Sequence, residues 1–227
     1  KKALIILSCV VVAGLAFATA FLLTYDRERR VTEKPVLYVY SPQEQRLTVS
    51  VDVDGAIDTA YPAPDALETT DWGTRASWTV TASPDGTLTD ASGRTYPSLF
   101  WDGPVGQESP EEGFVVARED AVPFLEEKLA LLGLTDKEAA DFITYWAPRI
   151  HANEYTFVSF DASSYTAHAR YSFTDEAGAP VEPDTFIRVF MTIRQAEATT
   201  QVREQAFGPT PQRTGLVTVE WGGTEEQ

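Results

Sequence analysis

The chain has 227 residues, 43% of them hydrophobic, a formal net charge of −16 at pH 7 and a single cysteine, Cys9. Such an acidic chain repels nucleic-acid phosphates and anionic lipid headgroups, and one cysteine excludes both an intrachain disulfide and a cysteine-based structural zinc site. The hydrophobic fraction is ordinary for a folded protein, and the length suffices for one domain with a substantial core.

An uncharged hydrophobic segment runs from Ala3 to Tyr25. As a helix it would span about 34 Å, slightly more than the roughly 30 Å hydrocarbon core of a bilayer. Lys1-Lys2 and the Ala18-Thr19-Ala20 pattern also fit a signal peptide cleaved after Ala20, but the apolar run continues beyond that point. We therefore expect residues 1–30 to be a retained transmembrane anchor with its flank. We place the rest on the extracytoplasmic side, although the flanking arginines do not favour this orientation.

Residues 31–35 are expected to form a linker, followed by one acidic domain over residues 36–221 and a polar tail over residues 222–227. The domain begins with strand signals in residues 35–40 and in residues 47–53, where apolar and polar residues alternate. Asp54-Gly55 predicts a hairpin turn that returns through residues 56–62, and Pro84-Asp85-Gly86 predicts a second hairpin.

Helical signals follow a further predicted strand in residues 113–118. Apolar residues recur at helical spacing between Phe124 and Leu132, and Gly133 is a typical helix stop. Thr135 and Glu138 form a capping box that predicts the start of a second helix, ending or kinking near Pro148. These signals predict a helical hairpin.

Strand patterns resume after the hairpin, in residues 153–160, 163–173 and 184–195, and late strands are expected in residues 202–208 and 214–223. Strands, a helical pair and more strands predict an α+β fold. The expected architecture is a largely antiparallel sheet with an inserted helical hairpin, preceded by one transmembrane helix.

Several motifs between Lys34 and about Gln195 occur in a recognisable order: KPVLYVYSP, YPSLFWDG, GFVVAREDAVPFLEEKLALLGL, DFITYWAPRI, NEYTFVSF and DTFIRVFM. This stretch resembles a family of uncharacterised bacterial proteins that are exported or membrane-anchored. The resemblance implies one such domain outside the cytoplasm. It implies no established activity and no catalytic residues.

Motifs for cofactor or metal chemistry are not found. The two histidines, His151 and His168, belong to no H-E-x-x-H pattern, and no phosphate-binding glycine motif occurs, so we expect no cofactor and no metal centre. Asp52 and Asp54 resemble part of a calcium loop but lack its distal glutamate, which leaves at most weak Ca²⁺ binding. A hydrolase that uses His151 or a pair of carboxylates remains an alternative.

Two groups of residues are candidate binding residues. Tyr96, Phe100, Trp101 and Asp102 lie in a turn-flanked run that could stack a sugar or grip a peptide, unless Phe100 and Trp101 are core residues. Arg188 is expected on an inward strand face between two phenylalanines. A buried guanidinium needs a carboxylate partner, for which we expect Asp102 or Asp184, in a structural ion pair or a substrate clamp.

These observations favour a non-enzymatic role. The leading expectation is a single-pass, membrane-anchored accessory protein that binds other membrane or envelope proteins or forms part of their assembly. The alternatives are an extracytoplasmic hydrolase of wall polymer or peptide and a sugar- or cation-binding module.

Overall fold

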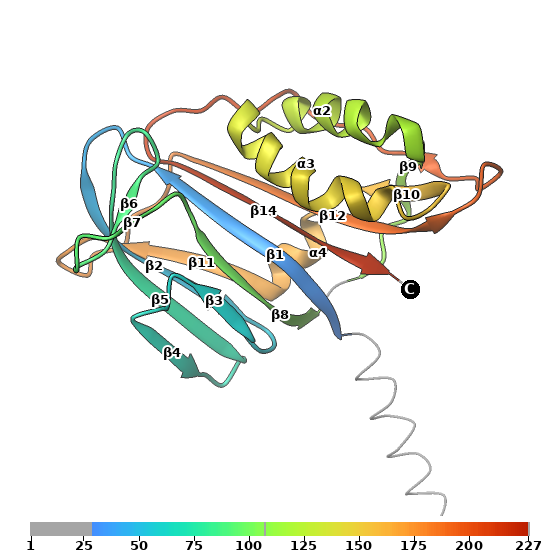
Figure 1. Ribbon diagram of the computed structural model, residues 1–227. Coiled ribbons are helices and arrows are strands. Elements are labelled where there is room, and N and C mark those ends of the chain that lie inside the picture. The colour runs from blue at the N-terminus through green and yellow to red at the C-terminus, as the bar shows by residue number, and fades with distance from the viewer. Residues whose placement is uncertain (1–28, 107, 227) are drawn as a thin grey trace, which may run out of the picture.

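The computed structural model describes residues 29–106 and 108–226 (Figure 1). The predicted transmembrane segment, residues 3–25, lies outside this range. Within the described residues, no helix combines the length and the hydrophobicity needed to cross a bilayer.

A central eight-stranded sheet has a pair of helices on one face and a second sheet on the other (Figure 1). Its strand order is β13-β9-β10-β12-β14-β1-β8-β3, and its pairs are antiparallel except β12 with β14 and β13 with β9. The strands are β1 (Arg29–Tyr40), β3 (Thr59–Tyr61), β8 (Leu99–Gly106), β9 (Glu112–Ala117), β10 (Tyr155–Ser159), β12 (Thr185–Ala196), β13 (Arg203–Glu204) and β14 (Val217–Glu226).

The second sheet is antiparallel, with the order β11-β2-β5-β6-β7, and β4 pairs with β5 at its edge. Its strands are β2 (Gln45–Val53), β4 (Ala66–Thr69), β5 (Thr74–Ala82), β6 (Leu88–Thr89), β7 (Thr95–Tyr96) and β11 (Ala169–Thr174). The helical elements are η1 (Arg118–Asp120), α2 (Ala121–Leu131), α3 (Asp136–Ile150) and α4 (Ser163–His168). The predicted α+β class is therefore confirmed.

Side chains alternate between the two faces of the central sheet, and a hydrophobic core covers each face. In β1, Val36 and Tyr38 belong to the core under the helices, whereas Leu37 and Val39 belong to the core between the sheets. Because successive side chains of a strand point to opposite faces, a sheet covered on both faces needs a nearly continuous apolar run. The run in residues 36–39 meets this need.

The predicted helical hairpin is confirmed in detail. The side chain of Thr135 and the backbone of Glu138 form the capping box at the start of α3, and Gly133 adopts a φ of 90° just after α2. The helix α3 continues past Pro148 to Ile150, because a proline in the last turn interrupts little of the helical hydrogen bonding.

Other sequence predictions differ from the structure. The expected linker, residues 31–35, is part of β1, where it pairs with β8 and β14, and the expected tail continues β14 to Glu226. Asp54-Gly55 does not close a hairpin, because β2 pairs with β5 and β11 while β3 joins the other sheet. Residues 163–168 form α4 rather than a strand, with the backbone N–H of Ser163 donating to Asp161 at its start.

Glu138, on α3, connects the helical hairpin to Arg213 in the loop between β13 and β14. Its side chain is fully buried, and its two carboxylate oxygens accept hydrogen bonds from the Arg213 guanidinium, both at 2.8 Å, and from the Tyr40 hydroxyl at 2.7 Å. Burial opposes ionisation, but the hydrogen bonds from Arg213, Tyr40 and the Thr135 backbone outweigh it and lower the pKa of Glu138.

This lowered pKa predicts a pH-dependent contribution to stability. A carboxyl whose folded pKa is depressed stabilises the protein above its unfolded pKa, here near 4.5, and loses this effect as pH falls through the folded value. In urea unfolding, we expect Glu138→Gln to lower the free energy of unfolding by about 2–4 kcal/mol at pH 7 and by less at pH 3. Exposed Glu126→Gln is the control. An equal loss at both pH values would contradict the prediction.

Candidate functional site

A buried polar network lies between the two sheets. Glu220, 1% exposed, accepts hydrogen bonds from Arg188 Nε at 2.6 Å and from the Tyr165 hydroxyl at 2.6 Å. Arg188 also donates to the carbonyl of Ala169 at 3.0 Å, and Trp101 Nε1 donates to the Tyr171 hydroxyl at 2.8 Å.

The network assigns a structural role to Arg188. The expected partners were wrong: Glu220 neutralises Arg188, while Asp184 accepts a hydrogen bond from the backbone N–H of Leu216. Burial raises the pKa of Tyr165 and of Tyr171 far above the usual value, so both hydroxyls remain protonated donors. The pair joins β12 to β14 within the central sheet, the bond from Arg188 to Ala169 reaches the start of β11 in the second sheet, and the carboxylate of Glu220 is occupied.

The run around Trp101 is not one aromatic platform. Trp101 is buried between the sheets, whereas Phe100 packs against the core under the helices and Asp102 is half-buried on that same side. Strand geometry explains the split, because neighbouring residues of β8 point to opposite faces. Tyr96, on β7, is separate from them and lines a groove at the surface of the second sheet.

The two histidines and the residues that resemble a calcium loop, Asp52 and Asp54, occupy positions in local structural contacts. His168 Nδ1 lies 3.1 Å from Asp54, and His151 follows α3 as its C-cap. Asp52 pairs with Arg75 at 2.8 Å. Across residues 29–106 and 108–226, no three side chains of the metal-binding types converge.

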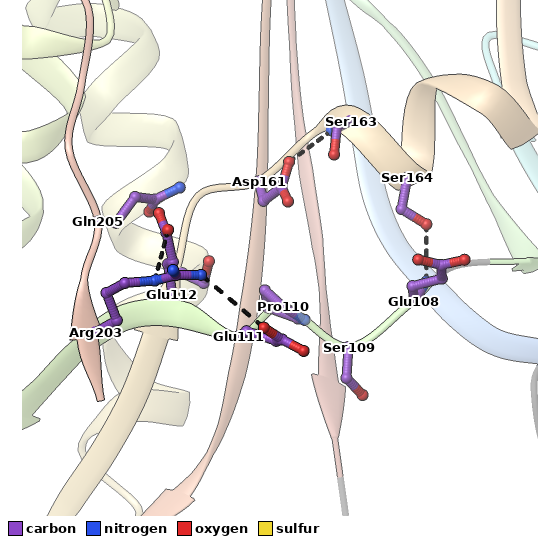
Figure 2. A pocket seen from close by; sticks show the side chains of 11 residues that line it. Glu108, Ser109, Pro110, Glu111, Glu112, Asp161, Ser163, Ser164, Arg203 and Gln205 are labelled. Carbon is purple, nitrogen blue, oxygen red and sulfur yellow. Dashed lines mark hydrogen bonds and ion pairs between the residues drawn. The ribbon is translucent and has the colours of Figure 1, made fainter. Parts of the chain in front are cut away.

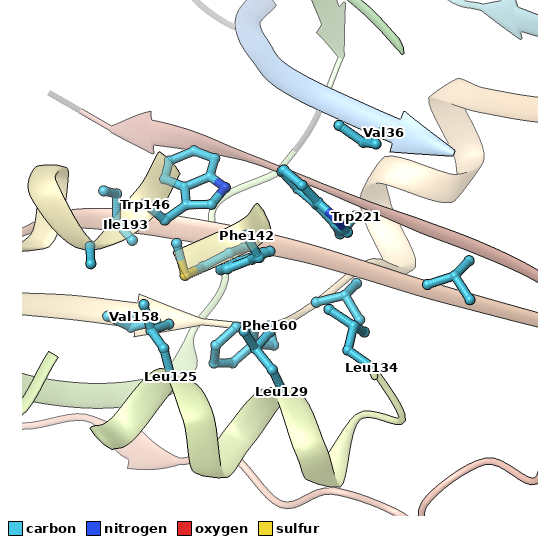
Figure 3. Packing of buried hydrophobic residues seen from close by; sticks show 14 of the residues in the cluster. Val36, Leu125, Leu129, Leu134, Phe142, Trp146, Val158, Phe160, Ile193 and Trp221 are labelled. Carbon is cyan, nitrogen blue, oxygen red and sulfur yellow. The ribbon is translucent and has the colours of Figure 1, made fainter. Parts of the chain in front are cut away.

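A cluster of charged and aromatic side chains lies where β1 approaches α3. Figure 3 shows Trp146 and Trp221 on either side of Phe142 in the underlying core. Above them, Lys34 Nζ lies 4.7 Å from the Tyr145 ring centre, and the Tyr145 hydroxyl donates to Glu33. Lys34 has a φ of 52° in an irregularity of β1. These contacts tie a bulged strand to a helix, and we assign them a structural role.

A polar cleft of about 450 Å³ lies between the β8–β9 loop, the start of α4 and β13 (Figure 2). Four acidic residues line it, Glu108, Glu111, Glu112 and Asp161, against one basic residue, Arg203. Serines, Pro110 and Gln205 complete the lining. The cleft therefore carries an excess of negative charge.

The single arginine does not neutralise this excess. Arg203 Nε lies 2.8 Å from Glu112, and its Nη2 lies 3.9 Å from the largely exposed Glu111. Asp161 accepts a hydrogen bond from the backbone N–H of Ser163, and the backbone N–H of Glu108 donates to Ser164 Oγ. The carboxylates of Glu108 and Asp161 thus remain without a basic partner among the lining residues.

Ser159 is the distinctive residue of this acidic cleft. It lines the cleft from the end of β10, its side chain is fully buried, and its hydroxyl has no hydrogen-bond partner among the described residues. Leaving a buried hydroxyl unpaired costs about 1–3 kcal/mol. Because this hydroxyl has no exposed surface, a ligand that supplies the missing hydrogen bond must displace the residues that cover it, and it would then recover this cost.

The arrangement suits an extended organic cation better than a metal ion. A calcium ion needs several oxygen ligands converging on one point, and the carboxylates of the cleft do not converge in this way. Lysine and arginine side chains bring their own hydrogen-bond donors and can each reach a separate carboxylate. The lining contains no histidine that could act as a base.

Little in the sequence indicates this site. Its residues come from three separate segments, residues 108–112, 159–164 and 203–205, and the acidic cluster in residues 108–112 resembles an ordinary solvated loop. The burial of the Ser159 hydroxyl depends on residues that are distant from it in the sequence. Only the tertiary structure reveals it.

The fold is a three-layered α+β arrangement with an acidic cleft. No protein-family model, no curated protein and no solved structure matches the chain.

Proposed function

We propose that this chain is a membrane-anchored, extracytoplasmic accessory protein that binds a lysine- or arginine-rich segment of another envelope protein. The hydrophobic segment Ala3–Tyr25 supports the anchor. The acidic cleft supports the binding role, and the observation that carries it is the buried, unpaired hydroxyl of Ser159 within a negatively charged lining.

Charge complementarity determines the class of partner. Carboxylates at a protein surface attract basic segments, steer their approach and form charge-assisted hydrogen bonds with lysine and arginine. Because such attraction is screened by salt, we expect the complex to weaken as ionic strength rises.

Neutralising the cleft should release the partner. We expect Glu108→Gln/Asp161→Asn in the full chain, extracted from membranes with a mild detergent, to reduce recovery of co-purifying proteins about tenfold. Glu126→Gln/Glu127→Gln on α2 removes the same charge from another surface and should have no effect. A chain that always purifies alone, or equal losses in both variants, would overturn the proposal.

Ser159→Ala separates binding from folding. Removing an unpaired buried hydroxyl should leave the free energy of unfolding unchanged or raise it by about 1 kcal/mol. Binding of a synthetic lysine-rich peptide, followed by fluorescence anisotropy, should weaken severalfold. A variant that loses stability and keeps its affinity would show that the hydroxyl serves the fold.

A further inference from the structure

A second concave surface lies on different elements from the acidic cleft. A groove of about 420 Å³ is formed by the segment after β3, the strand β5 and the turn that precedes β7. Its floor contains the buried rings of Trp78 and Tyr96, and its rim carries the exposed side chains of Tyr61, Asp65 and Arg94. This tyrosine groove combines an aromatic surface with hydrogen-bonding groups.

The ring of Tyr61 is exposed to solvent, and contacts of its ring and of the neighbouring backbone hold it in place. Its ring is 53% exposed and meets the Tyr96 ring edge to face, with 5.7 Å between the ring centres. The carbonyl of the next residue, Pro62, accepts a hydrogen bond from Trp78 Nε1 at 2.7 Å. The strand β3 also pairs with β8, so Tyr61 lies opposite Phe100. An exposed ring held in this way offers a preorganised stacking surface.

The opposite rim is rigid for a different reason. Asp90 accepts hydrogen bonds from the backbone N–H groups of Ser92 and Arg94 and from the Tyr96 hydroxyl. The Ser92 hydroxyl also donates to Asp90. This bond has the largest effect, and together the hydrogen bonds lower the pKa of Asp90 to about 2. The turn therefore keeps its shape, while the Arg94 guanidinium lies 5.5 Å from the Tyr96 ring centre and makes no hydrogen bond to the described residues.

We propose that the tyrosine groove is a carbohydrate-binding site that stacks one pyranose ring on Tyr61. The apolar C–H face of a pyranose matches a single flat aromatic ring, and its hydroxyls match Arg94 and Asp65 at the rim. A proline-rich peptide instead requires a series of exposed aromatic ridges. Among the described lining residues, Tyr61 is the one large aromatic side chain that is exposed.

The test measures saccharide binding to the full chain in detergent by calorimetry. The probes are tetramers of β-1,4-linked N-acetylglucosamine, β-1,4-linked glucose and α-1,4-linked glucose. We expect at least one to bind, Tyr61→Ala to weaken it about tenfold, and Tyr61→Phe to remain within about threefold because the ring persists.

Two controls make the outcome specific to this groove. Leu67→Ala alters an equally exposed residue, 55% exposed on β4 and outside the groove lining, and should bind like the parent. Glu108→Gln/Asp161→Asn in the acidic cleft should also leave saccharide binding unchanged, so this inference and the proposed function fail independently. No binding of any probe, equal binding by Tyr61→Ala, or binding of a proline-rich peptide alone would overturn the proposal.

Discussion

We expect Arg188→Met to lower the free energy of unfolding by about 3–5 kcal/mol, because it leaves the buried carboxylate of Glu220 without its partner. The hydroxyl of Tyr165 still donates to Glu220, but one neutral hydrogen bond does not compensate a buried charge. Urea unfolding at pH 7 measures the effect. A substrate clamp would behave differently, since its loss would abolish binding and leave stability unchanged.

Two further variants serve as controls for Arg188→Met. Arg188→Met/Glu220→Gln removes both charges, and we expect it to recover a large part of the lost stability. Arg46→Met breaks an exposed pair, in which Arg46 lies 3.7 Å from Glu176, and should cost about 1 kcal/mol or less. If Arg188→Met were as mild as Arg46→Met, the network would not support the fold.

Trp101→Ala should also cost about 3–5 kcal/mol, because it opens a cavity between the sheets and leaves the Tyr171 hydroxyl without a donor. Thermal or urea unfolding measures this loss. Trp72→Ala is the matched control, since Trp72 is half-buried and contacts Arg170 through a cation–π interaction at 4.2 Å. Its expected cost is about 1 kcal/mol. A Trp101→Ala protein as stable as the parent would contradict the core role of Trp101 and would favour the alternative that it is a binding platform.

Local signals in the sequence were sufficient to predict some elements of the fold. The capping box of Thr135 and Glu138 and the stop at Gly133 define the helical hairpin from neighbouring residues alone. The two faces of β12 also follow from alternation, which correctly places Arg188 on the side of Phe186 and Phe190. These features depend on chain geometry rather than on partners.

Partners were harder to predict because they are distant in the sequence. Glu220 reaches Arg188 only because β14 lies beside β12, and nothing near residue 188 specifies that neighbour. Asp54-Gly55 has the composition of a hairpin turn, yet β5 and β11 compete successfully for both sides of β2. Pairing between strands is decided by the burial of whole faces, which a local motif does not report.

The candidate binding residues show the same limit. Of the aromatic run, Tyr96 lines the tyrosine groove, and its exposed neighbour there, Tyr61, comes from another segment of the chain. Phe100 and Trp101 were correctly considered as alternative core residues. The acidic cleft had no sequence signature, because three separate segments form it.

The position of β14 has a consequence for how this molecule acquires its structure. The last strand along the described chain lies in the middle of the central sheet, between β12 and β1, and joins Tyr40 to Val217 across most of the sequence. Contacts between such distant residues slow folding, since a long loop must close first. Until β14 arrives, β1 and β12 present open hydrogen-bonding edges that invite aggregation. The newly made chain is therefore most prone to aggregation before its last described strand has paired.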